Sequence, residues 1–132
     1  MKISTRLRYS SRLLVALAER GRVASTTELG RELGVSPLYL RPIALDLEKH
    51  GLIESLRGAR GGYRLVQSPS SITMLDLAKI QENLNLVPCL RDPSVCPFSQ
   101  TCKTRKLWLK LRKCIEEFLA SISLEDVIKE EI

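Results

Sequence analysis

The chain has 132 residues, which is enough for one domain, or for one domain with an appended segment. Its hydrophobic content of 44% is ordinary for a globular protein, and no apolar run is long enough to predict a transmembrane helix. The net charge is +6, and residues 1–66 carry all of that excess while residues 67–132 are neutral, so a polyanionic partner is favoured for the first half.

Two helices are predicted before residue 34. Apolar residues recur at helical spacing over residues 8–19, and Gly21 is a typical residue to end that helix. Thr26 or Thr27 can cap a second, shorter helix that runs to about Leu33, because a threonine hydroxyl accepts a hydrogen bond from the first free backbone N–H groups.

A third helix is predicted to follow the turn at residues 34–35. Ser36 caps it, and Pro37 takes the first helical position, where a missing N–H costs little. Pro42 removes a backbone hydrogen bond further along, so we expect a kink there, or a helix that begins only around Arg41. Two helices joined by a short glycine turn predict a helix-turn-helix.

Two short strands, 52–54 and 63–65, are predicted to pair behind this helix as a hairpin. The turn between them contains two arginines and the pair Gly61-Gly62, which can adopt positive φ and close the turn without a steric clash. A helix for the major groove and a basic wing for the neighbouring groove or backbone predict a DNA-binding domain.

The early residues of a recognition helix face base edges, so Arg41 can pair with guanine and Tyr39 can reach a phosphate or a thymine methyl group. The wing arginines suit phosphates or a narrow minor groove, although each could also be a solvated surface charge. The predicted DNA-binding residues are Arg8, Ser36, Leu38, Tyr39, Arg41, Arg57, Arg60, Gly61, Gly62 and Tyr63.

Three helices are predicted in the second half. Thr73 caps the first, at 74–82; a long amphipathic helix covers 104–121; and Ser123 caps a last helix at 124–129. The long helix carries a broad apolar stripe, which predicts a dimer interface or packing against the chain's own body. The dimer residues proposed on that stripe are Leu107, Trp108, Leu111, Ile115 and Phe118.

Three cysteines, Cys89, Cys96 and Cys102, have the spacing C-x6-C-x5-C, and Cys114 follows on the long helix. The N-terminal residues lack the apolar core of a signal peptide, so we expect a cytoplasmic protein with reduced thiols. Clustered thiols there indicate a metal or iron–sulfur site, and the absence of C-x2-C pairs favours a cluster over zinc. Cysteines without any cofactor remain the alternative.

With these motifs the chain resembles the Rrf2 family of bacterial winged-helix regulators. The resemblance rests on Arg8-Tyr9, residues 36–40, 49–53 and 57–63, the three cysteines, Leu107-Trp108 and residues 122–127. It implies a dimeric repressor that binds a palindromic operator in double-stranded DNA. It also implies a cluster on the three cysteines, with [2Fe-2S] favoured over [4Fe-4S].

Two departures concern the fourth cluster ligand. Arg105 stands where one type of family member has a histidine, and Arg8 stands where another type has an acid. Cys114, Asp92 or a small exogenous ligand therefore remain as candidates, and an incompletely ligated iron would suit a sensor of oxygen, nitric oxide or thiols.

The resulting fold class is mainly α with a small β-wing, with a winged helix-turn-helix at residues 1–68 and a cluster-binding loop and dimerisation helix at residues 69–132. The predicted function is a sequence-specific regulator that senses iron–sulfur, redox or nitric-oxide status. The alternative is a cluster-free regulator of the same fold that is controlled by thiol oxidation or a protein partner. An enzyme is not expected, because the chain has one histidine, no nucleophile motif and no phosphate-binding loop.

Overall fold

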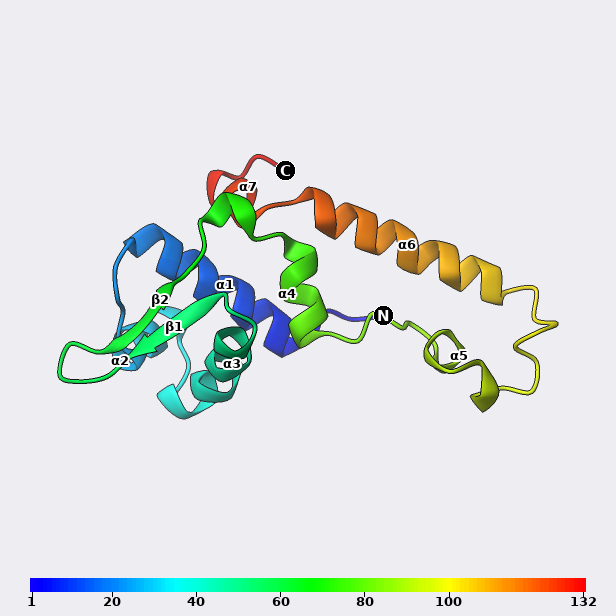
Figure 1. The fold of residues 1–132 in the computed structure, drawn as a ribbon, viewed down its shortest axis with the longest axis horizontal. Coiled ribbons are helices and arrows are strands. Elements are labelled where there is room, and N and C mark those ends of the chain that lie inside the picture. Colours follow the sequence, from blue (N-terminus) through cyan, green and yellow to red (C-terminus); the bar gives the residue numbers. More distant parts are fainter.

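The computed structural model describes residues 1–132 and is mainly helical, with one two-stranded antiparallel sheet (Figure 1). This matches the predicted fold class. The elements in chain order are α1 (Thr5–Arg20), α2 (Thr26–Leu33), α3 (Pro37–Lys49), β1 (Ile53–Leu56), β2 (Gly62–Leu65), the 3-10 turn η1 (Pro69–Ser71), α4 (Met74–Gln81), α5 (Pro88–Arg91), the 3-10 turn η2 (Pro93–Val95), α6 (Arg105–Ser121) and α7 (Leu124–Lys129).

Serine residues begin the first three helices. Ser4, Ser25 and Ser36 each accept a hydrogen bond from the backbone N–H three residues later, at 3.1–3.2 Å. The first helix therefore starts at Thr5, earlier than predicted, and the second is capped by Ser25 rather than by a threonine. The first start was late because apolar spacing does not mark where a helix begins, and the second cap was wrong because several neighbouring hydroxyl residues can cap.

Helix α3 runs without interruption from Pro37 through Pro42, so the alternative start at Arg41 is wrong. Pro42 lacks an N–H and leaves one carbonyl of the preceding turn without its helical donor. The helix persists because its opposite face is buried: Leu40, Ile43 and Leu47 are at most 2% exposed. Tertiary packing of that face outweighs one missing hydrogen bond.

The core lies where α1 meets α2, α3, α4 and α7. Its largest buried side chains are Leu13, Leu14, Leu17, Leu29, Leu40, Ile43, Leu47, Ile53, Ile72, Leu77 and Leu124. The ends of the second half are tied together by backbone hydrogen bonds from Met74 N to Ile122 O and from Leu124 N to Ile72 O, both 2.8 Å. Thr73 and Ser123 cap α4 and α7 as predicted, and both belong to capping boxes.

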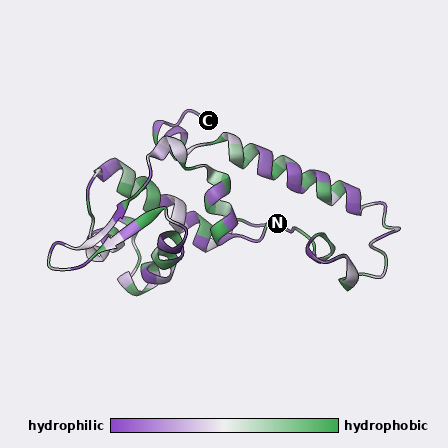
Figure 2. Ribbon diagram, in the orientation of Figure 1, coloured by the Kyte–Doolittle hydropathy of each residue, from purple (hydrophilic) through white to green (hydrophobic).

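Helix α6 extends away from this core, and α5 lies beside its far end (Figure 1). Green apolar and purple polar segments alternate along α6 in Figure 2, as expected for an amphipathic helix. None of its residues is buried. None of the helices is both long and apolar enough to cross a membrane.

Candidate DNA-binding surface and cysteine segment

Helix α3 presents an exposed outer face next to the wing. Leu38, Arg41, Pro42 and Leu45 recur at helical spacing on that face, and all four are exposed. Ser36 is also exposed, but its hydroxyl accepts the Tyr39 N–H at 3.2 Å and so holds the start of the helix. Of the predicted recognition residues, Leu38 and Arg41 are thus the ones with free side chains at this face.

Tyr39 belongs to an aromatic pair between α3 and α1. Its ring packs edge-on against Tyr9, with centroids 5.5 Å apart, and the Arg12 guanidinium lies 5.3 Å from the centre of the Tyr9 ring. Such contacts limit the rotamers of both aromatic side chains and of the arginine. Arg8 is exposed on the same helix. Sequence reasoning missed this pairing because Tyr9 and Tyr39 are 30 residues apart.

The wing is a hairpin in which Leu56 pairs with Gly62 and Ile53 with Leu65. Arg57 and Arg60 lie exposed in the connecting turn, and Arg64 forms an ion pair with Glu54 across the strands. The structure therefore contains the predicted hairpin, with two exposed arginines at its tip.

The prediction for its glycines needs a correction. Gly58, at φ 107°, and Gly62, at φ 152°, have positive φ, whereas Gly61 does not. Gly61 is required for space instead, because a Cβ there would lie 2.2 Å from the Leu56 carbonyl oxygen. A Cβ on Gly62 would lie 2.1 Å from the Ala24 carbonyl oxygen. Both glycines therefore shape the wing and its attachment to the domain.

Tyr63 lies at the base of the wing. Its backbone exchanges two 2.9 Å hydrogen bonds with Ala24, and its side chain is half-buried against the core. Burial raises the pKa of Tyr63, and the negative charge of Glu48 raises it further. Tyr63 therefore attaches the base of the wing to the core, whereas Arg57 and Arg60 are exposed at its tip.

A polar link that the sequence does not reveal joins α3 to the end of α4. The Arg6 guanidinium forms an ion pair with Asp46 of α3, and its Nε donates to Gln81 Oε1 at 3.2 Å. The Ser4 backbone N–H also donates to Glu82 Oε2 at 2.7 Å. Gln81 ends α4 and Glu82 is its C-cap, directly before residues 83–102, the segment that contains Cys89, Cys96 and Cys102. Arg6 therefore links α3 to the helix that precedes this cysteine segment.

The three cysteines lie on short turns rather than in one continuous loop. Cys89 is on α5, Cys96 ends η2, and Cys102 precedes α6; all are partly buried and reduced. Ser99 organises the middle, donating to the backbone carbonyls of Pro93 at 2.7 Å and Cys96 at 3.0 Å. No group of three or more histidine, cysteine, aspartate or glutamate side chains is positioned to hold a metal ion.

Thr104 and Arg105, at the start of α6, contact Cys102 and Cys89. The Thr104 hydroxyl lies 3.2 Å from Cys102 Sγ and lowers the pKa of that thiol, and the backbone N–H groups of Arg105 and Thr104 lower it further. Arg105 donates from Nη2 to the Cys89 carbonyl oxygen at 3.4 Å. Its Nε is buried and has no hydrogen-bond partner, so a donor next to the cysteines is unsatisfied.

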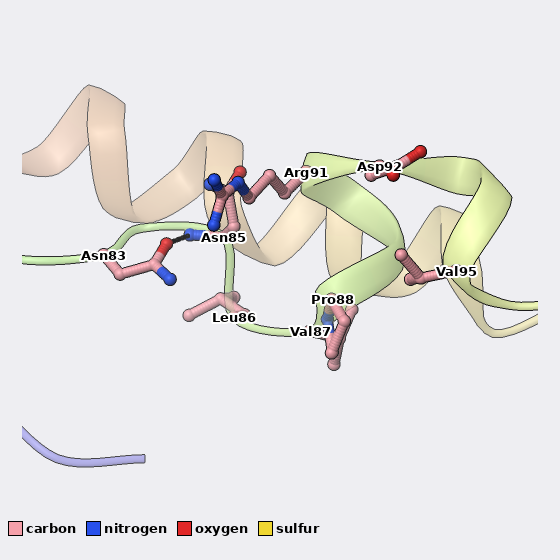
Figure 3. A pocket seen from close by; sticks show the side chains of 8 residues that line it. All are labelled: Asn83, Asn85, Leu86, Val87, Pro88, Arg91, Asp92 and Val95. Atoms are coloured by element: carbon pink, nitrogen blue, oxygen red, sulfur yellow. Dashed lines mark hydrogen bonds between the residues drawn. The ribbon is translucent and has the colours of Figure 1, made fainter.

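A pocket of about 520 Å³ lies between the 83–87 segment and α5 (Figure 3). Asn83 and Asn85 line one side, where the Asn83 side chain accepts the Asn85 backbone N–H at 2.9 Å. Asp92, one candidate for a fourth cluster ligand, accepts two hydrogen bonds from Ser94, the shorter at 2.7 Å. These bonds lower the pKa of Asp92 and occupy one of its carboxylate oxygens, Oδ1, within its own turn.

The predicted dimer stripe lies along α6. Leu107 and Phe118 are 55% and 58% exposed, while Trp108, Leu111 and Ile115 are partly buried. An apolar groove of about 440 Å³ runs beside the stripe, and Met1, Ile3, Leu84 and Leu86 contribute to its walls. Cys114 lines this groove and not the segment with the other three cysteines.

Comparison with known proteins identifies relatives over nearly the whole chain. A profile described as Rrf2, iron-dependent transcriptional regulator, matches residues 3–130. Protein rrf2 of Nitratidesulfovibrio vulgaris is 31% identical over 133 residues, covering 98% of this chain and 89% of that protein. The regulator CymR of Bacillus subtilis is 32% identical over 130 residues, covering 96% and 89%. The solved structure of T. potens IscR superimposes with a TM-score of 0.79 at 30% identity, covering 100% and 89%.

Proposed function

Because this chain belongs to the Rrf2 family of transcriptional regulators, we propose that it represses transcription by binding a palindromic operator through α3 and the wing. The observation that carries this proposal is that Arg41 of α3 and Arg57 and Arg60 of the wing are exposed. They belong to residues 1–66, which have a net charge of +6. Arg41 pairs with guanine in the major groove, while Arg57 and Arg60 contact phosphates or the minor groove.

The test is DNA affinity measured against salt concentration. Arg57→Ala should weaken binding to all sequences and reduce the slope of log affinity against log salt by about one. Arg41→Ala should instead relax base preference at one position, at a cost of about 1–3 kcal/mol. Arg91→Ala, an exposed arginine on α5, is the matched control and should change neither quantity. Equal behaviour of all three variants would contradict the proposed surface.

The same proposal includes a homodimer formed through α6. A single chain leaves Leu107 and Phe118 more than half exposed, next to an apolar groove that reaches the N-terminal residues. Apolar area of this kind is stabilised when a second copy covers it. A two-fold dimer would also place two recognition helices on the two halves of a palindrome.

We further propose that Cys89, Cys96 and Cys102 bind an iron–sulfur cluster, of the [2Fe-2S] rather than the [4Fe-4S] type, whose state changes DNA affinity. The residues fit in kind: three thiols lie on one segment, and the unsatisfied Arg105 Nε–H beside them can donate to an anionic group. They are not grouped around a common point, so binding has to draw the segment together. The cluster supplies redox chemistry and the chain supplies thiolates.

Iron and acid-labile sulfide are to be counted on protein purified without oxygen, together with its visible spectrum. Cys96→Ala should lose iron and sulfide in equal proportion, whereas Cys114→Ala should keep both, because Cys114 lies in the groove of α6. The ratio per chain and the band shape distinguish two irons from four. Iron-free wild-type protein, even after reconstitution, would contradict the cluster proposal and leave the DNA-binding proposal intact.

A cluster-free regulator controlled by its thiols is the second candidate. Two observations favour it: no three cysteines are positioned as ligands, and hydrogen bonds lower the pKa of Cys102. A solved structure with 30% identity and a TM-score of 0.75 is described as the oxidized form of CymR from Staphylococcus aureus. In a cluster-free regulator the lowered pKa of Cys102 makes it the thiol that reacts first with oxidants.

A further inference from the structure

The outer face of α3 is more apolar than an exposed helix face needs to be. Leu38 is 73% exposed and Leu45 is 48% exposed, and Pro42 lies between them at the surface. Between Leu38 and Leu45, Arg41 is the one exposed residue of this face whose side chain can donate a hydrogen bond, and Lys49 follows one turn later. A solvated helix face normally carries charged and polar residues, so these side chains need a different explanation.

The charge around this face identifies what covers it. Arg41 lies on the face itself, Arg57 and Arg60 extend from the adjacent wing, and residues 1–66 carry the whole excess charge of the chain. An apolar protein surface would leave these cations without partners, whereas duplex DNA supplies phosphates to them. The occupant of the α3 face is therefore a major groove.

Two polar residues near Leu38 at the start of the helix, Ser36 and Tyr39, already have contacts within the protein. The Ser36 hydroxyl accepts the Tyr39 N–H, and the Tyr39 ring packs against Tyr9. Leu38 makes no such contact, and its side chain is 73% exposed in the first turn of α3, where recognition helices meet base edges. Because an isobutyl group neither donates nor accepts hydrogen bonds, it can distinguish bases only by apolar contact.

The C5-methyl group of thymine is the apolar group that the major groove presents. We infer that Leu38 is a specificity-determining residue that packs against a thymine methyl group, next to the guanine read by Arg41. This inference rests on the proposed DNA-binding function and deepens it. The operator half-site then contains a thymine whose methyl group, and not only its hydrogen-bonding pattern, contributes to affinity.

The test begins with an operator selected by the wild-type protein from random duplexes. Each thymine of one half-site is replaced singly by uracil, which removes the methyl group and keeps every hydrogen-bonding group. One replacement should weaken binding about three- to fivefold, as expected for one buried methyl group. At that same position, 5-methylcytosine should bind better than cytosine by a similar factor.

Leu38→Ala should reduce the uracil effect at that position to less than twofold, while other positions keep their wild-type response. Ile132→Ala, which truncates a 75% exposed apolar residue at the far end of the chain, is the control and should retain the full effect. Leu38 is exposed, so this variant should fold, and its melting temperature and dimer mass provide the check.

The possible failures are distinguishable. If no selected duplex binds better than random DNA, the proposed function fails together with the inference. If a duplex is selected but no thymine responds to uracil, or if Leu38→Ala leaves the response unchanged, Leu38 is not the reader and the proposed function stands. If Leu38→Ala changes the oligomeric state of the protein and leaves the uracil response unchanged, a second protein chain covers this face. That result also overturns the inference.

Discussion

At the scale of single residues, the start of α6 sets the chemistry of the cysteine segment. Cys102 lies where three hydrogen-bond donors converge: the Thr104 hydroxyl and the backbone N–H groups of Thr104 and Arg105. These donors stabilise a negative charge on sulfur, so they favour the thiolate at a given pH. Cys114, exposed midway along α6, has no comparable arrangement in its surroundings.

We predict that Cys102 is alkylated faster than Cys114 in metal-free protein near pH 7. The lowered pKa of Cys102 increases its thiolate fraction below the ordinary thiol pKa, and the advantage should shrink above that value, where the lowered pKa no longer changes the thiolate fraction. Iodoacetamide labelling followed by peptide mass analysis gives both rates. Thr104→Val should slow Cys102 and leave Cys114 unchanged; an unchanged Cys102 rate would assign its reactivity to other groups.

At the scale of elements, local signals predicted most helices and both strands. Ser36 with Pro37, Thr73 with Asp76, and Ser123 with Asp126 each mark a helix start that the structure contains. The short turns α5 and η2 were not predicted, although Pro88 and Pro93 begin them. Turns of three or four residues lack a hydrophobic period, so proline alone does not distinguish them from loop.

The candidate site was predictable where it depends on neighbours in sequence and missed where it depends on distant ones. The spacing of Arg57 and Arg60 in the hairpin located the basic tip of the wing. The contact between Tyr9 and Tyr39 and the link from Arg6 to Asp46 join segments 30 and 40 residues apart. No local pattern encodes such contacts, because they are created by the packing of α1 against α3.

Helix α6 carries the element-scale prediction. Leu107→Glu should shift the protein from dimer to monomer at micromolar concentration, because the dimer would have to bury a charge in place of the exposed Leu107 side chain. Sedimentation equilibrium measures the mass. Lys110→Glu changes the charge of an exposed residue on the same helix and should leave the dimer intact. Dissociation of both variants would point to general repulsion, and dissociation of neither to a different interface.

At the scale of the whole molecule, Arg6 adds a polar link to the packed contacts that α1 makes with both α3 and α4. Arg6 is bound on one side to Asp46 of the recognition helix and on the other to Gln81, the last residue of α4. The segment with the cysteines follows α4 in the chain, so a displacement that reaches the end of α4 would act on Arg6 and through it on α3. A change of state at the cysteines can reach α3 through this link or through the packed contacts of α1 with α3 and α4.

We predict that Arg6→Ala weakens this coupling without abolishing DNA binding or iron loading. The measured quantity is the ratio of operator affinities between protein with intact cysteines and its Cys96→Ala counterpart, determined with and without Arg6. Exposed ion pairs and hydrogen bonds contribute about 1 kcal/mol each at most, so the ratio should move toward one by about two- to fivefold. Arg22→Ala removes an ion pair with Glu28 that touches neither α3 nor α4, and should leave the ratio unchanged. An unchanged ratio in Arg6→Ala would mean that coupling passes through the packed contact of α1 with α4. Equal affinities of the wild-type protein and Cys96→Ala, both with Arg6, would mean that Cys96 does not control DNA binding.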